Sequence, residues 1–123
     1  MVWYGLAAEQ GNADAQSKLG FMYLNEIGVL QDFAEAAKWL RLAAEQGNAD
    51  AQINLGVIHS NGDGVLQSNV MAHMWYDIAF ANGQSEAEEL RDERAGLMAR
   101  ADVSKAQQMA RECMTSDYQN CSW

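Results

Sequence analysis

Residues 6–16 read LAAEQGNADAQ, and residues 42–52 repeat those eleven letters without a change, 36 positions later. The similarity extends outward, because aligning residues 3–38 with residues 39–74 gives 20 identical pairs. Two sets of residues carry the same spacing into a third copy, namely Trp3, Trp39 and Trp75, and Gly11, Gly47 and Gly83. A fixed period of this length is typical of repeat proteins, whose units bury their apolar faces against one another.

Each unit has the pattern of two helices joined by a tight turn. Apolar residues in 33–46 recur at helical spacing, and charged side chains take the opposite face. Gly47 is placed to end this helix in the left-handed conformation, and Asn48 to cap a second helix at about 49–60. The chain contains no proline, which also favours helix. The sequence therefore predicts an all-α fold.

The string A-x-x-W-hydrophobic-x-x-A-A-E-Q-G-N-A-D-A-Q-x-x-L-G, carried by residues 36–56 and followed by Gly62 and Gly64, resembles the Sel-one-like repeat, a relative of the tetratricopeptide repeat. The resemblance covers about residues 1–98. It implies a right-handed superhelical solenoid of antiparallel helix pairs that serves as an adaptor or scaffold, often in bacterial envelope, secretion or stress pathways. Residues 106–112 resemble the C-terminal capping helix of such arrays.

We expect one domain spanning residues 1–123. Its predicted parts are a truncated first repeat at about 1–32, a second at 33–68, a third at 69–98, and a closing helix with a tail at 99–123. In the third copy Arg91 and Asp92 replace Leu55 and Gly56, which departs from the repeat pattern. This copy otherwise resembles a cap, because the acidic residues in 86–93 give it the polar outer face that a terminal repeat needs. The helix break near residues 99–102 is left open, with one long bent helix as the alternative.

The composition argues against several classes of function. The chain has seventeen acidic and eight basic residues, which give it a net charge of −9. Because the basic residues are scattered along the sequence, we expect no nucleic-acid binding. No apolar run approaches the ~18 residues of a membrane span. The N-terminus shows no export signal, which indicates a cytoplasmic location by default. A periplasmic or secreted location would apply to a fragment whose cysteines are bridged.

The residues capable of chemistry form no catalytic, cofactor or metal site in the sequence pattern. His59 is expected in the core and His73 on an open face, without metal-ligand spacing. Residues 61–64, NGDG, lack the ligands of a calcium loop and are interpreted as a turn. Cys113 and Cys121 are predicted to form a disulfide that ties the tail to the last helix, with two free thiols as the alternative.

We expect partner binding in a groove formed by the leading helices, as the resemblance to tetratricopeptide-type solenoids implies. Positions that differ between copies are free to carry specificity, and they give the predicted groove residues Tyr4, Lys38, Arg41, His73, Tyr76 and Asp77. The predicted function is a non-enzymatic scaffold that binds a protein or peptide. A homodimer formed through the apolar end at residues 1–3 is one alternative, and a hydrolase or transferase is another.

Overall fold

The computed structural model describes residues 2–25, 32–63, 67–119 and 121, with side chains described from residue 5 onward. These residues form seven α-helices and no strand. The helices are α1 (Val2–Glu9), α2 (Ala13–Asn25), α3 (Phe33–Ala44), α4 (Ala49–Asn61), α5 (Asn69–Ala81), α6 (Ala87–Ala95) and α7 (Arg100–Thr115). None of the described helices is long and apolar enough to span a membrane.

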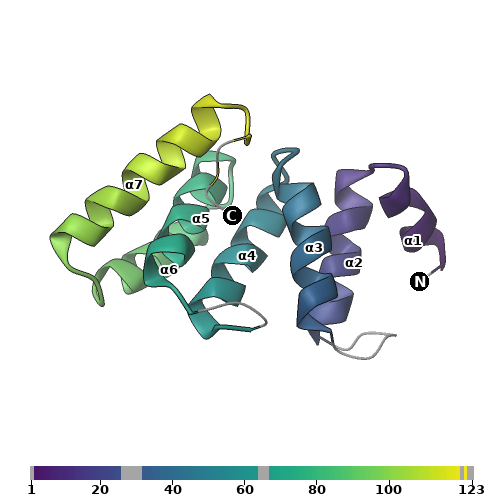
Figure 1. Cartoon of the computed structure of the whole chain (residues 1–123), viewed down its shortest axis with the longest axis horizontal. Helices are drawn as coiled ribbons and strands as arrows, with labels where there is room; N and C mark the ends of the chain where they lie inside the picture. Colours follow the sequence, from purple (N-terminus) through teal and green to yellow (C-terminus); the bar gives the residue numbers. More distant parts are fainter. Residues whose placement is uncertain (1, 26–31, 64–66, 120, 122–123) are drawn as a thin grey trace.

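The helices stack side by side from α1 at one end of the molecule to α6 and α7 at the other (Figure 1). Each helix from α1 to α5 packs on the next one in the chain, most extensively α2 on α3 and α4 on α5. Helix α2 also contacts α4, the equivalent helix of the next repeat. The helices therefore form two layers, with α2, α4 and α6 in one layer and α1, α3 and α5 in the other.

The repeated glycine–asparagine pair ends one helix and starts the next. Gly11, Gly47 and Gly83 all have positive φ, 84° at Gly47, a conformation that glycine adopts without steric cost. The Asn48 side chain accepts a 2.9 Å hydrogen bond from the Ala51 amide and so caps α4. The structure thus confirms that Gly47 ends one helix and that Asn48 caps the next.

A ladder of amide side chains joins successive repeats. Gln16 is buried, donates to the Ala8 carbonyl at 3.0 Å, and accepts from Gln46 of the next repeat at 2.8 Å. The same two bonds recur 36 residues later, at 3.2 and 2.9 Å, through Gln52, Ala44 and Asn82. Because a buried amide without partners would be destabilising, these bonds explain why the repeated stretch keeps its glutamines.

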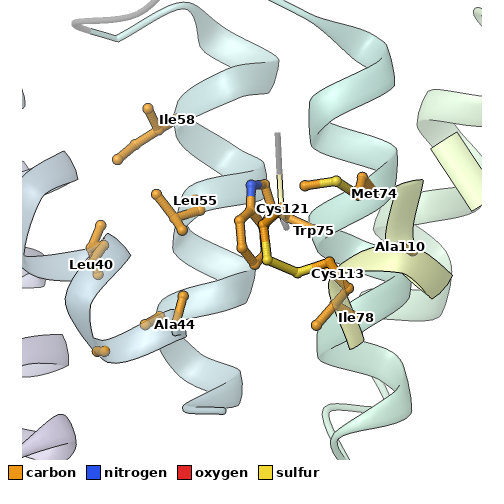
Figure 2. Packing of buried hydrophobic residues seen from close by; sticks show 12 residues of the cluster. Leu40, Ala44, Leu55, Ile58, Met74, Trp75, Ile78, Ala110, Cys113 and Cys121 are labelled. Carbon is orange, nitrogen blue, oxygen red and sulfur yellow. A yellow bond between two sulfur atoms is a disulfide. The ribbon is translucent and has the colours of Figure 1, made fainter. Parts of the chain in front are cut away.

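The repeated tryptophans have equivalent surroundings. Trp39 packs on a cluster containing Ala8, Ala15 and Leu19. Trp75 packs on a larger cluster that includes the residues 36 positions further along, Ala44, Ala51 and Leu55. In Figure 2 the larger cluster also receives Met74 and Ile78 from α5, Ala110 from α7, and the disulfide between Cys113 and Cys121. The cluster around Trp75 forms the main core of the molecule.

The glycines inside α2 and α4 mark close helix crossings. A Cβ at Gly20 would lie 2.6 Å from Cγ of Leu40, closer than van der Waals contact allows. A Cβ at Gly56 would overlap the ring of Tyr76, which is the repeat equivalent of Leu40. The recurrence of glycine at these positions therefore reflects close packing against the following helix.

We expect Gly56→Ala to lower the free energy of unfolding by about 1–3 kcal/mol, because Tyr76 is buried and must shift to make room for a methyl group. The control is Gly5→Ala in α1, where no described atom lies within 4 Å of the added Cβ. That substitution should raise stability by up to about 1 kcal/mol through helix propensity alone. Urea unfolding of both variants measures the difference, and equal shifts would contradict the close crossing.

The third repeat contains the helix break that the sequence leaves open. Helix α6 ends at Ala95 and α7 begins at Arg100, so residues 96–99 separate them. No side chain caps α7 at Ala99. The closing helix is therefore a separate element that packs on α5.

Candidate protein-binding surface

A cavity of about 400 Å³ opens between α2 and α4. This volume is within the range found for ligand-binding pockets in proteins. Seven residues line it, four from α2 and three from α4: Ser17, Lys18, Phe21, Met22, Asp50, Ile53 and Asn54. All seven come from the second helices of the helix pairs predicted from the sequence.

The cavity combines apolar side chains with one charge of each sign. Phe21 is 43% exposed, although it is one of the largest apolar side chains in the chain. Ile53 is half-buried, and Lys18 and Asp50 are exposed. The Asp50 carboxylate accepts a hydrogen bond from Gln84, which holds it in place. Such a lining can cover an apolar side chain of a ligand and also bond to its polar groups.

A second cavity, of about 200 Å³, lies one repeat further along the same layer, between α4 and α6. Val57, the repeat equivalent of Phe21, lines it together with Leu90. Tyr76 also lines this cavity, and burial raises the pKa of its hydroxyl, which a hydrogen bond with Ser60 partly opposes. The two cavities therefore lie one after the other along the layer formed by α2, α4 and α6.

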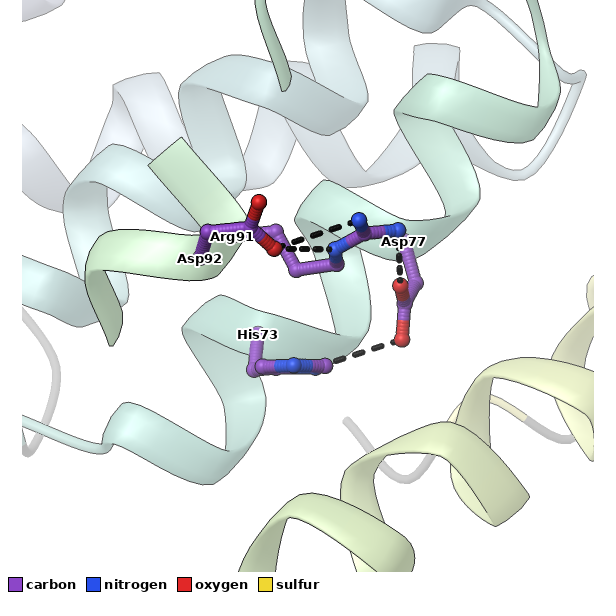
Figure 3. Close-up of polar contacts among 4 residues, drawn as sticks. All are labelled: His73, Asp77, Arg91 and Asp92. Atoms are coloured by element: carbon purple, nitrogen blue, oxygen red, sulfur yellow. Dashed lines mark hydrogen bonds and ion pairs between the residues drawn. The ribbon is translucent and has the colours of Figure 1, made fainter. Parts of the chain in front are cut away.

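A polar network holds α6 against α5 (Figure 3). Arg91 donates to Oδ1 of Asp77 at 3.2 Å and pairs with Asp92 on its own helix. The other oxygen of Asp77 lies 3.2 Å from Nδ1 of His73. Burial lowers the pKa of Arg91, but its hydrogen bonds with Asp92 and Asp77 outweigh this and raise the pKa overall. The guanidinium therefore stays charged and fixes α6.

The Sel1 repeat signature matches residues 1–12, 13–48 and 49–84, more than half of the chain and at the same 36-residue period. The chain belongs to the Sel1 repeat family. Members of this family are typically protein-interaction scaffolds. No curated protein sequence matches the chain.

Two solved structures are similar to this Sel1 repeat chain. One is c5321, described as a protective antigen of uropathogenic Escherichia coli strains with an SLR fold, with a TM-score of 0.89 and 31% identity over 94% of the chain. The other is a Sel1 repeat protein from Oxalobacter formigenes, with a TM-score of 0.71 and 26% identity over 86% of the chain. The chain spans 26% and 47% of these two proteins. They confirm the predicted all-α solenoid of helix pairs.

The Sel1 signature frames the units differently from the boundaries predicted from the sequence. Its full units open with α2 at residue 13 and with α4 at residue 49, whereas the predicted second unit opened at residue 33. The period is the same, and only the helix that opens each unit differs. In the frame of the signature, the two cavities lie along the opening helices.

The predicted groove residues do not come together on one open surface of the Sel1 array. His73 and Tyr76 are 2% and 3% exposed, so the prediction that they are available to a partner is wrong. Ala37, the repeat equivalent of His73, is buried as well, which shows that variation between copies here reflects core packing. Lys38 is exposed, and Arg41 and Asp77 are half-buried. The side chains of Tyr4 and of the apolar end at residues 1–3 are not among those that the structure describes.

The remaining candidate residues of this Sel1 chain have structural surroundings. A disulfide joins Cys113 with Cys121, and both are buried beside Trp75. His59 is 8% exposed, in the core position expected for it. Within the described ranges, no three His, Cys, Asp or Glu side chains come together in a group that could hold a metal ion.

Proposed function

We propose that the chain is a non-catalytic scaffold that binds an extended segment of another protein in the cavity between α2 and α4. The observation that carries this proposal is the exposure of Phe21 in the wall of a cavity of about 400 Å³. An aromatic side chain in such a position gains free energy when a ligand covers it, about 25 cal/mol for each Å² of apolar surface removed from water.

The rest of the cavity favours a peptide over a small apolar molecule. Lys18 and Asp50 offer a donor and an acceptor beside the apolar wall, and Asn54 adds an amide that can bond to a peptide backbone. The neighbouring hollow beside Val57 provides room for a second side chain of the same segment. The net charge of −9 favours a partner whose segment carries basic residues.

A displayed library of random 12-residue peptides tests the proposal. We expect the chain to enrich peptides that pair apolar residues with basic ones, and Phe21→Ser to reduce the affinity for them at least tenfold. Phe80→Ser on α5 is the matched control, because Phe80 is 38% exposed but lies outside this cavity. Affinity for one enriched peptide, measured by fluorescence anisotropy, provides the comparison.

The control variant should bind the enriched peptide as the unchanged chain does. Circular dichroism shows whether both variants keep their helices, which we expect because both phenylalanines are partly exposed. Enrichment that survives Phe21→Ser, or that is lost equally with Phe80→Ser, would exclude the α2–α4 cavity as the binding site.

A further inference from the structure

The segment that follows α7 folds back onto the core of the molecule. Asp117 and Tyr118 have φ values of 56° and 65°, which turn the chain sharply after the end of the helix. The disulfide then holds Cys121 against Cys113, and Cys121 is 1% exposed. The tail, described at residues 117–119 and 121, thus covers the main core beside Trp75.

The tail rests on features that belong to the repeat. A Cβ at Gly47 would lie 3.6 Å from the Tyr118 ring, so the ring lies directly over the turn between α3 and α4. The Tyr118 hydroxyl accepts a 2.9 Å hydrogen bond from Asn82, which belongs to the amide ladder. The disulfide covers Trp75 and Ile78, which are fully buried (Figure 2). We call this surface the tail seat.

An equivalent of the tail seat exists 36 residues earlier, between α1 and α3. Gly11 replaces Gly47, with the same positive φ, and Gln46 replaces Asn82 in the ladder. No described atom lies within 4 Å of a Cβ placed at Gly11, so nothing corresponds to the Tyr118 ring there. Leu42, the equivalent of Ile78, is 39% exposed. We call this surface the vacant seat.

The vacant seat also differs in charge. Lys38 stands where the tail seat has the buried Met74, and its amino group lies 4.7 Å from the centre of the Trp39 ring. The Lys38 side chain is 55% exposed, and its pair with Glu35 at 3.4 Å is open to solvent. The seat therefore offers an exposed cation to an acidic group.

We infer that the vacant seat binds an acidic, aromatic turn of a partner protein, held as the chain holds its own Asp117–Tyr118 turn. The partner's aromatic ring covers Gly11 and Leu42, and its carboxylate pairs with Lys38. The two seats are equivalent in the repeat, and the tail fills one of them. The vacant seat is independent of the proposed function, because it lies between α1 and α3 and the cavity lies between α2 and α4.

The test uses the tail itself as the probe, as a synthetic peptide of residues 113–121, CMTSDYQNC, closed by its disulfide. Isothermal titration into the full chain should give one site, because the tail of the chain already fills the other seat. We expect Leu42→Glu to weaken binding at least tenfold through loss of the apolar contact and repulsion of the peptide's carboxylate. Lys38→Glu should weaken it as well, and binding should decrease as salt is added.

Leu97→Glu is the matched control, since Leu97 is 65% exposed and lies at the other end of the array, between α6 and α7. This variant should bind the peptide as the unchanged chain does. No measurable binding to the unchanged chain, or equal binding by Leu42→Glu, would overturn the inference. Concentration-dependent self-association that Leu42→Glu removes would assign the seat to the tail of a second copy and would likewise overturn it.

Discussion

Trp75→Ala should lower the free energy of unfolding by about 3–5 kcal/mol, which is a large part of the stability of a domain of this size. Trp75 has no exposed surface and contacts α3, α4 and the tail through its cluster. Its removal leaves a cavity that the disulfide and the surrounding helices cannot close, because they are held by other contacts. Urea unfolding followed by circular dichroism measures the loss without depending on tryptophan fluorescence.

Trp39→Ala is the matched control, since the two residues occupy the same position in successive repeats. Trp39 remains partly exposed and packs on a smaller cluster, so its removal should cost clearly less than that of Trp75. A still milder variant, Trp75→Phe, keeps the site measurable if the alanine variant does not fold. Equal losses at the two positions would mean that the tail contributes nothing to the second site.

Reducing the disulfide between Cys113 and Cys121 should lower stability by about 2–3 kcal/mol, the chain-entropy value for so short a loop. The loss has a second source, because the freed tail no longer holds Cys121 and Tyr118 against the core. Hydrogen exchange should therefore increase around the turn at Gly47, where the Tyr118 ring lies, as well as in the tail.

The double variant Cys113→Ala with Cys121→Ala separates the bond from the effect of the reductant. We expect it to unfold at the urea concentration of the reduced chain and to show no further change when reductant is added. A reductant effect of less than 0.5 kcal/mol on the unchanged chain, a threshold of about the size of an ordinary surface change, would contradict the stapling role of this bond.

Much of the fold could be predicted because the repeats of this chain can be aligned with one another. Identical residues 36 positions apart identified which positions are equivalent, and Gly47 with Asn48 predicted where one helix ends and the next begins. The close crossing at Gly56 also followed from recurrence alone. These features depend on local chemistry and on the period, both of which the sequence displays directly.

The location of a binding surface could not be predicted in the same way. Periodicity shows which residues are equivalent, but it does not show which layer of helices has open cavities. The difference between His73 and Ala37 predicts an open position, yet both side chains are buried, because a residue can vary between copies inside the core as well as on the surface. Phe21 was missed for a related reason, because an apolar residue on a helix is first expected in the core.

The alanine-rich helices, the amide ladder and the turns at Gly11 and Gly47 together make each unit chemically interchangeable with its neighbour. Duplication of one whole 36-residue module within the array gives the ladder amides equivalent partners in the new copy. An insertion of any other length would leave Gln16 or Gln52 facing the wrong group inside the protein. Such a gene can therefore change length in whole steps without redesigning its interior, and selection can then act on the outer residues of the new copy.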